Sequence, residues 1–149
     1  MNYFSLLNKE LETSDSFNFN EKYVHFKREE NLNHWDTYFD TKNKIQMIIL
    51  GRPTIEVSDW QEFNENEKNY ITKNLLKKYI NLEIENFCSE LNGAFSILIL
   101  DYKSNKILIV TDKLGIYPIY IYGKNIDEFQ FSSNFNYLVD NLVSNTNID

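Results

Sequence analysis

The sequence has few of the residues on which several classes of site depend. It holds one cysteine, Cys88, so an internal disulfide and a thiolate metal cage are excluded, and a reducing, cytoplasmic compartment is expected. Its two histidines, His25 and His34, do not supply a metal site at helical or hairpin spacing. The four glycines are too dispersed to form a phosphate-binding loop. No apolar run approaches the roughly 20 residues that span a bilayer.

Positive charge is also scarce. The 149 residues include 15 Lys and Arg against 22 Asp and Glu, which gives a formal net charge of -7. Because binding to nucleic-acid phosphates needs clustered basic side chains, this balance argues against a nucleic-acid surface. The length is near that of one compact domain with a sizeable core. We therefore expect a single domain over residues 1–143, followed over residues 144–149 by a tail or the start of a linker.

The stretch from Leu91 to Tyr120 predicts the fold most clearly. Ala94 to Asp101 is apolar at almost every position, which is typical of a strand covered on both faces. Turns at Lys103-Ser104-Asn105 and at residues 112–115 lead into strands over residues 106–110 and 116–122, an antiparallel meander. The side chains expected to be buried between layers are Phe95, Leu98, Leu100, Ile107, Ile109 and Ile119.

The remaining elements follow from periodicity and capping signals. Strands are predicted over residues 3–7, 23–26 and 45–50, the last stopped by Gly51-Arg52-Pro53, while residues 10–20 are predicted to be a loop. Three helices are predicted. The first is capped by Asn64 and Glu67 and buries Ile71, Leu75 and Tyr79. The second buries Ile84, Phe87, Cys88 and Leu91 and is closed by Gly93 in the left-handed conformation, and the third is capped by Ser132 or Ser133 and buries Phe135, Leu138, Val139 and Leu142.

A resemblance to a known family rests on Leu91, Asn92, Gly93, Phe95, Asp101, Asp112, Gly115, Pro118 and Tyr120. Their order resembles the end of the amino-terminal glutaminase-like domain of asparagine synthetases and related amide ligases, the class II glutamine amidotransferases. The resemblance covers residues 45–143. It implies a four-layer αββα sandwich of two antiparallel sheets, the fold of the amino-terminal-nucleophile hydrolases. A scaffold of this kind leaves the reaction open.

The residues that hydrolyse glutamine are missing where the resemblance places them. The family's nucleophile is its first residue, usually cysteine, activated by its own α-amine, whereas this chain begins Met1-Asn2. Leu50-Gly51-Arg52 stands in place of an Asn-Gly-Glu motif whose asparagine donates to the oxyanion. No carboxylate lies within residues 69–73 and no arginine within residues 31–44 to hold the glutamine. A vacated pocket without catalytic or metal-binding residues is expected at Met1, Asn2, Leu50, Gly51 and Arg52.

Other residues that could act in catalysis or binding have simpler explanations. Cys88 could pair with a histidine, but it lies on the apolar face of a predicted helix, where a cysteine usually behaves as a small buried hydrophobe. His34 is in a polar and aromatic loop that could bind a ligand, although solvation is the commoner state. Ser5, Thr13 and Ser14 could serve as nucleophiles only after internal cleavage, for which the sequence holds no signal.

The leading hypothesis is a degenerate, non-catalytic glutaminase-like domain. It would act as a structural or docking module of an asparagine-synthetase-like, ATP-dependent amide ligase, similar to β-lactam synthetases and lasso-peptide cyclases. The chain lacks a Ser-Gly-Gly-x-Asp-Ser nucleotide loop, so ATP and Mg²⁺ are expected only on a partner synthetase domain, in cis or in trans. Self-association is the other expected contact. Candidate interface residues are Trp35, Tyr38, Phe39, Tyr117, Tyr120 and Tyr122.

Two alternatives come from other classes of protein. The first is a free-standing binding protein that uses the vacated pocket for a small ligand or a peptide. The second is a hydrolase with an unrecognised nucleophile. Ammonia release from glutamine and binding to a synthetase domain distinguish these readings from the leading hypothesis.

Overall fold

The computed structural model of the chain describes residues 3–7, 15–19, 21–27, 35–54, 70–125 and 128–143. They fall into two compact units, one made of Met1–Leu32 and Pro118–Asp149 and the other of Asn33–Tyr117, and each unit contains one antiparallel sheet. The described strands are β1 (Tyr3–Leu7), β2 (Asp15–Phe19), β3 (Lys22–Lys27), β4 (Trp35–Asp40), β5 (Ile45–Thr54), β6 (Asn92–Asp101), β7 (Lys106–Thr111), β8 (Tyr120–Tyr122) and β9 (Gln130–Ser132). The described helices are α2 (Tyr70–Asn81), α3 (Ile84–Glu90) and α4 (Phe135–Val143).

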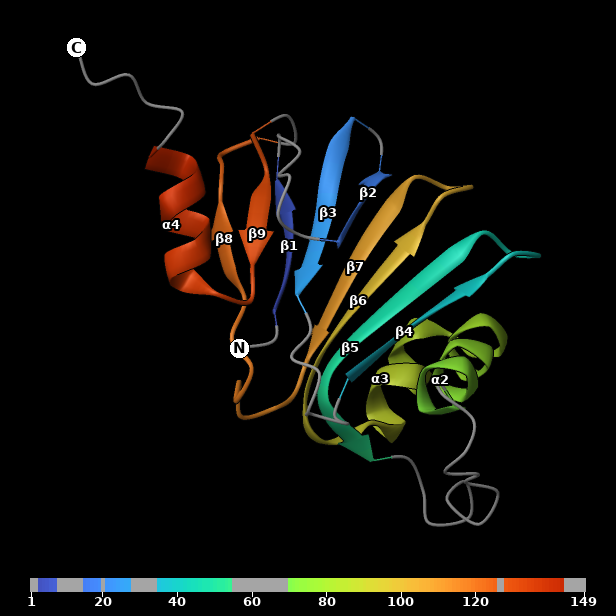
Figure 1. Ribbon diagram of the computed structural model, residues 1–149. Helices are drawn as coiled ribbons and strands as arrows, with labels where there is room; N and C mark the ends of the chain where they lie inside the picture. The colour runs from blue at the N-terminus through green and yellow to red at the C-terminus, as the bar shows by residue number, and fades with distance from the viewer. Residues whose placement is uncertain are drawn as a thin grey trace. The chain divides into compact units, whose positions relative to one another are not determined.

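The first unit joins early and late parts of the chain in one sheet (Figure 1). Its strands lie in the order β2-β3-β1-β9-β8, so β9 pairs antiparallel with β1. Phe4 and Leu6 of β1 alternate with Tyr3 and are completely buried. Helix α4 reaches the face that carries Tyr3, because the Tyr3 and Tyr137 ring centroids lie 4.3 Å apart. All five residues of β1 are thus buried, and α4 packs on the face that carries Tyr3.

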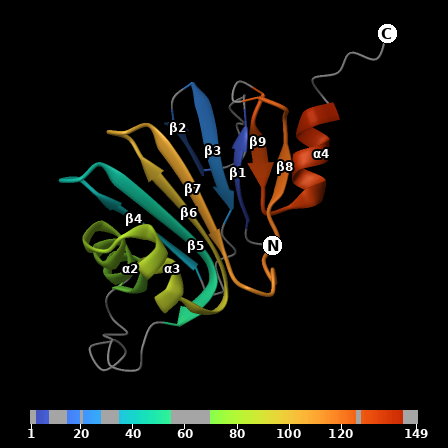
Figure 2. The same cartoon turned by 180° about the vertical axis from the view of Figure 1, so that it is seen from behind.

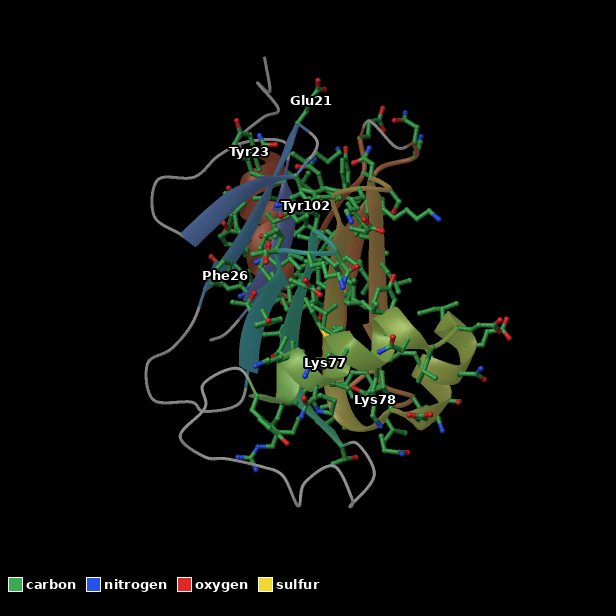
Figure 3. The ribbon with its side chains drawn as sticks, turned by 90° about the vertical axis from the view of Figure 1, so that its right-hand side faces the viewer. Glu21, Tyr23, Phe26, Lys77, Lys78 and Tyr102 are labelled. Atoms are coloured by element: carbon green, nitrogen blue, oxygen red, sulfur yellow. The ribbon has the colours of Figure 1, made fainter. Side chains whose placement is uncertain are left out.

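The second unit places its helices on one face of the sheet β4-β5-β6-β7 (Figure 2). The core cluster of this unit is Ile45, Met47, Ile49, Leu75, Leu76, Phe87, Leu91, Phe95, Ile97 and Ile99. Lys77 and Lys78 project from the polar side of α2 (Figure 3), and Lys78 Nζ lies 3.4 Å from Glu90 Oε2 of α3. Apolar burial therefore holds the two helices on the sheet, since a half-buried ion pair that solvent still reaches adds little.

Strand β6 is interior, as its near-continuous apolar run predicts. Ile97 and Ile99 belong to the core cluster, and Leu98 and Leu100, which alternate with them, are also completely buried. The prediction that Ile107, Ile109 and Ile119 are buried between layers is wrong, because these side chains are only half-buried. The first two lie on β7, the edge strand of the sheet, and Ile119 lies outside any strand.

Two strands occupy segments in which the sequence predicts no strand, one of them inside the predicted loop over residues 10–20. Asp15–Phe19 forms β2 and Trp35–Asp40 forms β4. Each is the edge strand of its sheet and pairs over its whole length with the neighbouring strand, β3 or β5. An edge strand is specified largely by the strand it joins, so its own alternation can be weak. That is why the sequence did not reveal them.

Strand β5 does not stop at Gly51 but continues to Thr54. Its pairing with β4 ends at Leu50, opposite Trp35, whereas its pairing with β6 continues to the end of the strand. Beyond Leu50 it therefore has one neighbour among the described strands. A proline, which has no N–H to donate, is tolerated on such an edge, and this explains Pro53 inside the strand.

The predicted third strand of the meander is shorter and belongs to the other sheet. Strand β8 begins at Tyr120 instead of Ile116 and pairs with β9, not with β7. Pro118 has no N–H, and the N–H groups of Leu114 and Ile116 donate to the Asp112 carboxylate. These groups cannot extend a β7 ladder, so the chain leaves that sheet here.

The helices keep most of their predicted buried faces. Leu75 and Phe87 are buried, and α2's predicted capping pair, Asn64 and Glu67, lies outside the described residues. The prediction of burial is wrong for Ile84 and Phe135, which are exposed. Each is the first residue of its helix, and because helical side chains point toward the N-terminus, it has no preceding turn to pack on.

Two predicted helix ends are also corrected. Asn134 caps α4, because its Oδ1 accepts the Tyr137 N–H at 3.1 Å, whereas Ser133 Oγ accepts the Phe4 N–H. Helix α3 ends before Gly93, which lies inside β6 with a φ of 97°. The left-handed conformation is as predicted, but its cause is a close approach of the backbone, since a Cβ at Gly93 would strike the Arg52 carbonyl oxygen.

The predicted α+β class is confirmed by two antiparallel sheets and three helices among the described residues, an arrangement compatible with a two-sheet sandwich. Both predicted turns are present. Asn105 adopts a φ of 57° before β7, and the Gly115 N–H donates to the Asp112 carbonyl oxygen at 3.2 Å.

Candidate functional site

Three of the residues predicted to line a vacated pocket lie in β5 at the end of its pairing with β4. Leu50 pairs with Ser96 of β6 and is only 2% exposed, Gly51 is half-buried, and Arg52 is exposed. The other two, Met1 and Asn2, lie outside the described residues. A buried leucine presents only C–H groups, so the Leu50 side chain cannot donate a hydrogen bond to a reacting oxygen.

Gly51 is held where only a glycine fits. Its φ is 85°, in the left-handed region that other residues adopt with strain. A Cβ at this position would collide with the Ala94 carbonyl oxygen, lie 2.6 Å from Cε2 of Tyr117, and lie 3.0 Å from the Phe95 Cα. The Tyr117 ring therefore packs directly on the Gly51 backbone.

This contact links a predicted pocket residue to a predicted interface residue. The sequence predicts only that Tyr117 is an aromatic side chain suited to an interface, and no local signal places it beside Gly51. The structure fixes it there by a second contact, because the Ser96 hydroxyl donates to the Tyr117 carbonyl oxygen at 2.5 Å. Leu50, Gly51, Arg52 and Tyr117 thus gather at one end of the second sheet.

Asp112 organises the turn that carries Tyr117. The residue is 7% exposed, and its carboxylate accepts N–H groups of Leu114 at 2.8 Å, Phe95 at 3.1 Å and Ile116 at 3.2 Å. Desolvation raises the pKa of this carboxyl, but the backbone donors outweigh it and hold the pKa below its ordinary value. The charged form of Asp112 is therefore the one that fits the turn.

Acidification is expected to remove stability from this turn. Because the pKa of Asp112 is lowered in the folded state, its contribution is present above the ordinary carboxyl value of about 4 and is lost as the pH falls through the lower folded value. Asp112→Asn should be less stable at neutral pH and should show a smaller loss between about pH 5 and pH 2. Urea unfolding at a series of pH values measures both. Parallel pH curves for the wild type and the variant would show that Asp112 plays no such part.

The remaining interface candidates lie in different surroundings. Tyr38 is half-buried and packs against the core cluster of the second unit. Phe39 is exposed, with its ring centroid 5.8 Å from that of Tyr102. Tyr120 and Tyr122 are exposed on β8 of the first unit, and the side chain of Trp35 lies outside the described residues. Tyr38 is thus part of a core, whereas Phe39, Tyr120 and Tyr122 remain accessible.

The single thiol has the surroundings of a packing residue. Cys88 is half-buried in α3 and packs against the core cluster, and burial raises the pKa of its thiol. A raised thiol pKa disfavours the nucleophilic thiolate. No group of three or more His, Cys, Asp or Glu side chains among the described residues is arranged to hold a metal ion.

One structural finding and two comparisons with known proteins bear on the identity of this chain. None of the helices that the structure describes has both the length and the apolar character needed to cross a membrane. A search of curated proteins finds no match to this chain. A family model described as a glutamine amidotransferase domain matches residues 59–140, which are 82 of the 149 residues, and the match runs through the predicted motif from Leu91 to Tyr120. The chain belongs to the glutamine amidotransferase domain family.

Proposed function

We propose that this chain is a glutaminase-like domain without glutamine chemistry, which serves as a structural or docking module of an asparagine-synthetase-like amide ligase. The observation that carries the proposal is Leu50. Its side chain is buried and aliphatic at the position where the resemblance expects an asparagine that donates to the oxyanion. Loss of one such donor lowers turnover by about 10²–10³-fold.

The neighbours of Leu50 support the same conclusion. Arg52 places a positive charge where the family motif has a glutamate. The Tyr117 ring packs on the backbone of Gly51, between these two positions. Glutamine bound at this point would meet an aliphatic side chain and an aromatic ring in place of the amide and carboxylate that the family motif provides.

The nucleophile is the second part of the proposal. Neither the Met1 thioether nor the Asn2 carboxamide is a competent nucleophile. Cys88 does not replace them, since it packs in a core with a raised thiol pKa. We therefore assign this chain a non-catalytic role.

The chemistry in this proposal belongs to a partner. An ATP-dependent synthetase domain, in cis or in trans, would bind ATP and Mg²⁺ and activate a carboxylate, as the resemblance to β-lactam synthetases and lasso-peptide cyclases implies. In such ligases the nitrogen comes from an amine of the substrate, so no ammonia is needed. A glutaminase-like domain can then keep its fold as a docking module after its hydrolytic residues are lost.

The purified protein is expected to be inert toward glutamine. It should release no ammonia above the buffer blank, and diazo or chloroketone analogues of glutamine should label neither Met1 nor Cys88. An active glutaminase in the same assay is the positive control. Ammonia release with stoichiometric labelling at either residue would overturn the proposal.

A pair of variants tests the role of Leu50 directly. Asn2→Cys alone should remain inactive, because Leu50 still leaves the oxyanion without its donor. The matched variant adds Leu50→Asn to Asn2→Cys and restores that donor. Glutamine hydrolysis by the single variant would show that Leu50 is not the limiting residue.

A further inference from the structure

Strand β8 ends the sheet of the first unit among the described strands and pairs only with β9 there (Figure 1). Its three residues are Tyr120-Ile121-Tyr122, none of which is charged. Ile121 is 60% exposed and Tyr122 is 51% exposed. An exposed, uncharged strand edge presents backbone N–H and C=O groups to any strand of matching length.

Each of the other described edge strands is longer than β8 and contains a charged residue. Strand β2 contains Asp15, β4 contains Asp36 and Asp40, and β7 contains Lys106. Charged residues on an edge strand oppose pairing with another chain, and natural proteins use them for this purpose. Three of the described edge strands thus contain a charged residue, and β8 contains none.

The apolar face of the first sheet continues to this edge. Direct cross-strand partners form one row that crosses four strands, namely Val24, Leu6, Phe131 and Ile121. Val24, Leu6 and Phe131 are completely buried, whereas the row ends at the exposed side chain of Ile121. A further strand beside β8 would cover this end of the row.

We propose that β8 is the docking edge for a second copy of this chain, with the two β8 strands antiparallel and Ile121 opposite Ile121 of the other copy. A twofold axis perpendicular to the sheet then joins the two apolar rows and places Tyr120 opposite Tyr122 of the other copy. Aliphatic and aromatic cross-strand pairs of this kind stabilise a sheet. The strand is therefore complementary to itself, which an interface with twofold symmetry requires.

Two further observations favour this edge as the contact. Each copy carries a formal net charge of -7, so two copies repel one another, and an uncharged edge adds no repulsion where they touch. Phe135 is 54% exposed, and its ring centroid lies 5.2 Å from that of Tyr120. It extends the apolar surface beyond β8, which matters because a three-residue strand supplies few backbone hydrogen bonds.

Sedimentation velocity over a concentration series tests the proposal. The wild type is expected to form a reversible dimer, and Ile121→Lys should weaken it by about tenfold or more, because two lysines would face each other at the axis. Leu114→Lys is the matched control, since Leu114 is 84% exposed on a turn of the second unit and should leave the dimer intact. Both variants should keep the wild-type unfolding midpoint at a protein concentration low enough for all three proteins to be monomeric. A wild type that stays monomeric, or an equal loss in both variants, would overturn the proposal.

Disulfide trapping tests the register without relying on the lysine variant. In a Cys88→Ser background, Ile121→Cys should crosslink two copies on oxidation, because directly opposed strand residues lie within disulfide range. Tyr122→Cys should not, because residues 122 of the two copies would lie about 8 Å apart on a diagonal. Equal or faster crosslinking of Tyr122→Cys would exclude this pairing.

Ionic strength provides the last discrimination. Added salt screens the repulsion between two negatively charged copies, so the proposed dimer should hold or strengthen. Association through surface ion pairs would weaken under the same conditions. A dimer that dissociates as salt rises would therefore contradict docking through β8.

Discussion

Leu98→Ala is expected to lower the free energy of unfolding by about 2–5 kcal/mol, the usual range for truncating a buried leucine. Leu98 is completely buried on β6, directly opposite Ile48 of β5 and Ile109 of β7. Both neighbours are held by continuous antiparallel ladders, so the strands cannot close the cavity that the truncation leaves. Urea unfolding followed by circular dichroism measures the loss as a lower midpoint at an unchanged slope.

The matched control for this truncation is Leu114→Ala. Leu114 is 84% exposed on the turn after β7, so its truncation should change stability by no more than about 0.5 kcal/mol. The difference between the two variants isolates burial from the loss of a leucine side chain as such. A cost for Leu98→Ala no larger than that of Leu114→Ala would show that β6 is not an interior strand.

The sequence predicted those parts of the fold that are set by local pattern. A run with almost no polar residue predicts that β6 is covered on both faces. In each of the three helices the spacing of apolar residues predicts a buried side chain, and the structure confirms burial of Leu75, Phe87 and Leu138. The edge strands β2 and β4 were missed, because pairing with β3 and β5 decides their conformation. Local pattern carries no information about such a neighbour.

The cap of α4 shows why a local signal can be ambiguous. Three consecutive residues, Ser132, Ser133 and Asn134, are all good caps by residue type. The Ser133 hydroxyl oxygen accepts a hydrogen bond from the Phe4 N–H, which is distant in sequence. The Ser132 hydroxyl oxygen accepts the Asn134 N–H at 3.0 Å. Asn134 is then the residue whose side chain accepts the helix N–H group. The choice depends on the tertiary fold.

The candidate site likewise has one part that the sequence predicts and one part that it does not. The spacing of Leu50-Gly51-Arg52 after a buried strand marks the position of the family motif, so these residues could be named from sequence. The ring of Tyr117 on the Gly51 backbone could not, because it depends on where the turn after β7 returns to β5. That return is fixed by the Asp112 carboxylate and by the Ser96 hydroxyl. Neither of these contacts has a signal in the local sequence.

Gly51→Ala is expected to lower the free energy of unfolding by about 2–5 kcal/mol. A left-handed conformation costs a non-glycine residue about 1–2 kcal/mol, and an overpacked contact adds about 1–3 kcal/mol. Two of the three atoms that a Cβ would meet, the Ala94 carbonyl oxygen and the Phe95 Cα, belong to the β6 backbone and cannot rotate away. The third, Cε2 of Tyr117, would be pushed from its position. Urea unfolding measures the loss, and near-ultraviolet circular dichroism reports the tyrosine displacement.

Gly115→Ala separates the two causes of this loss. Gly115 also has a positive φ, 64°, but no described atom lies within 4 Å of a Cβ built there. Its replacement should therefore cost only the conformational part, about 1–2 kcal/mol, and leave the tyrosine spectrum unchanged. The excess cost of Gly51→Ala then measures how tightly β6 and Tyr117 close over β5. Equal losses for the two variants would mean that backbone conformation alone requires glycine at position 51 and that the space beside it is open, which would remove Tyr117 from the candidate site.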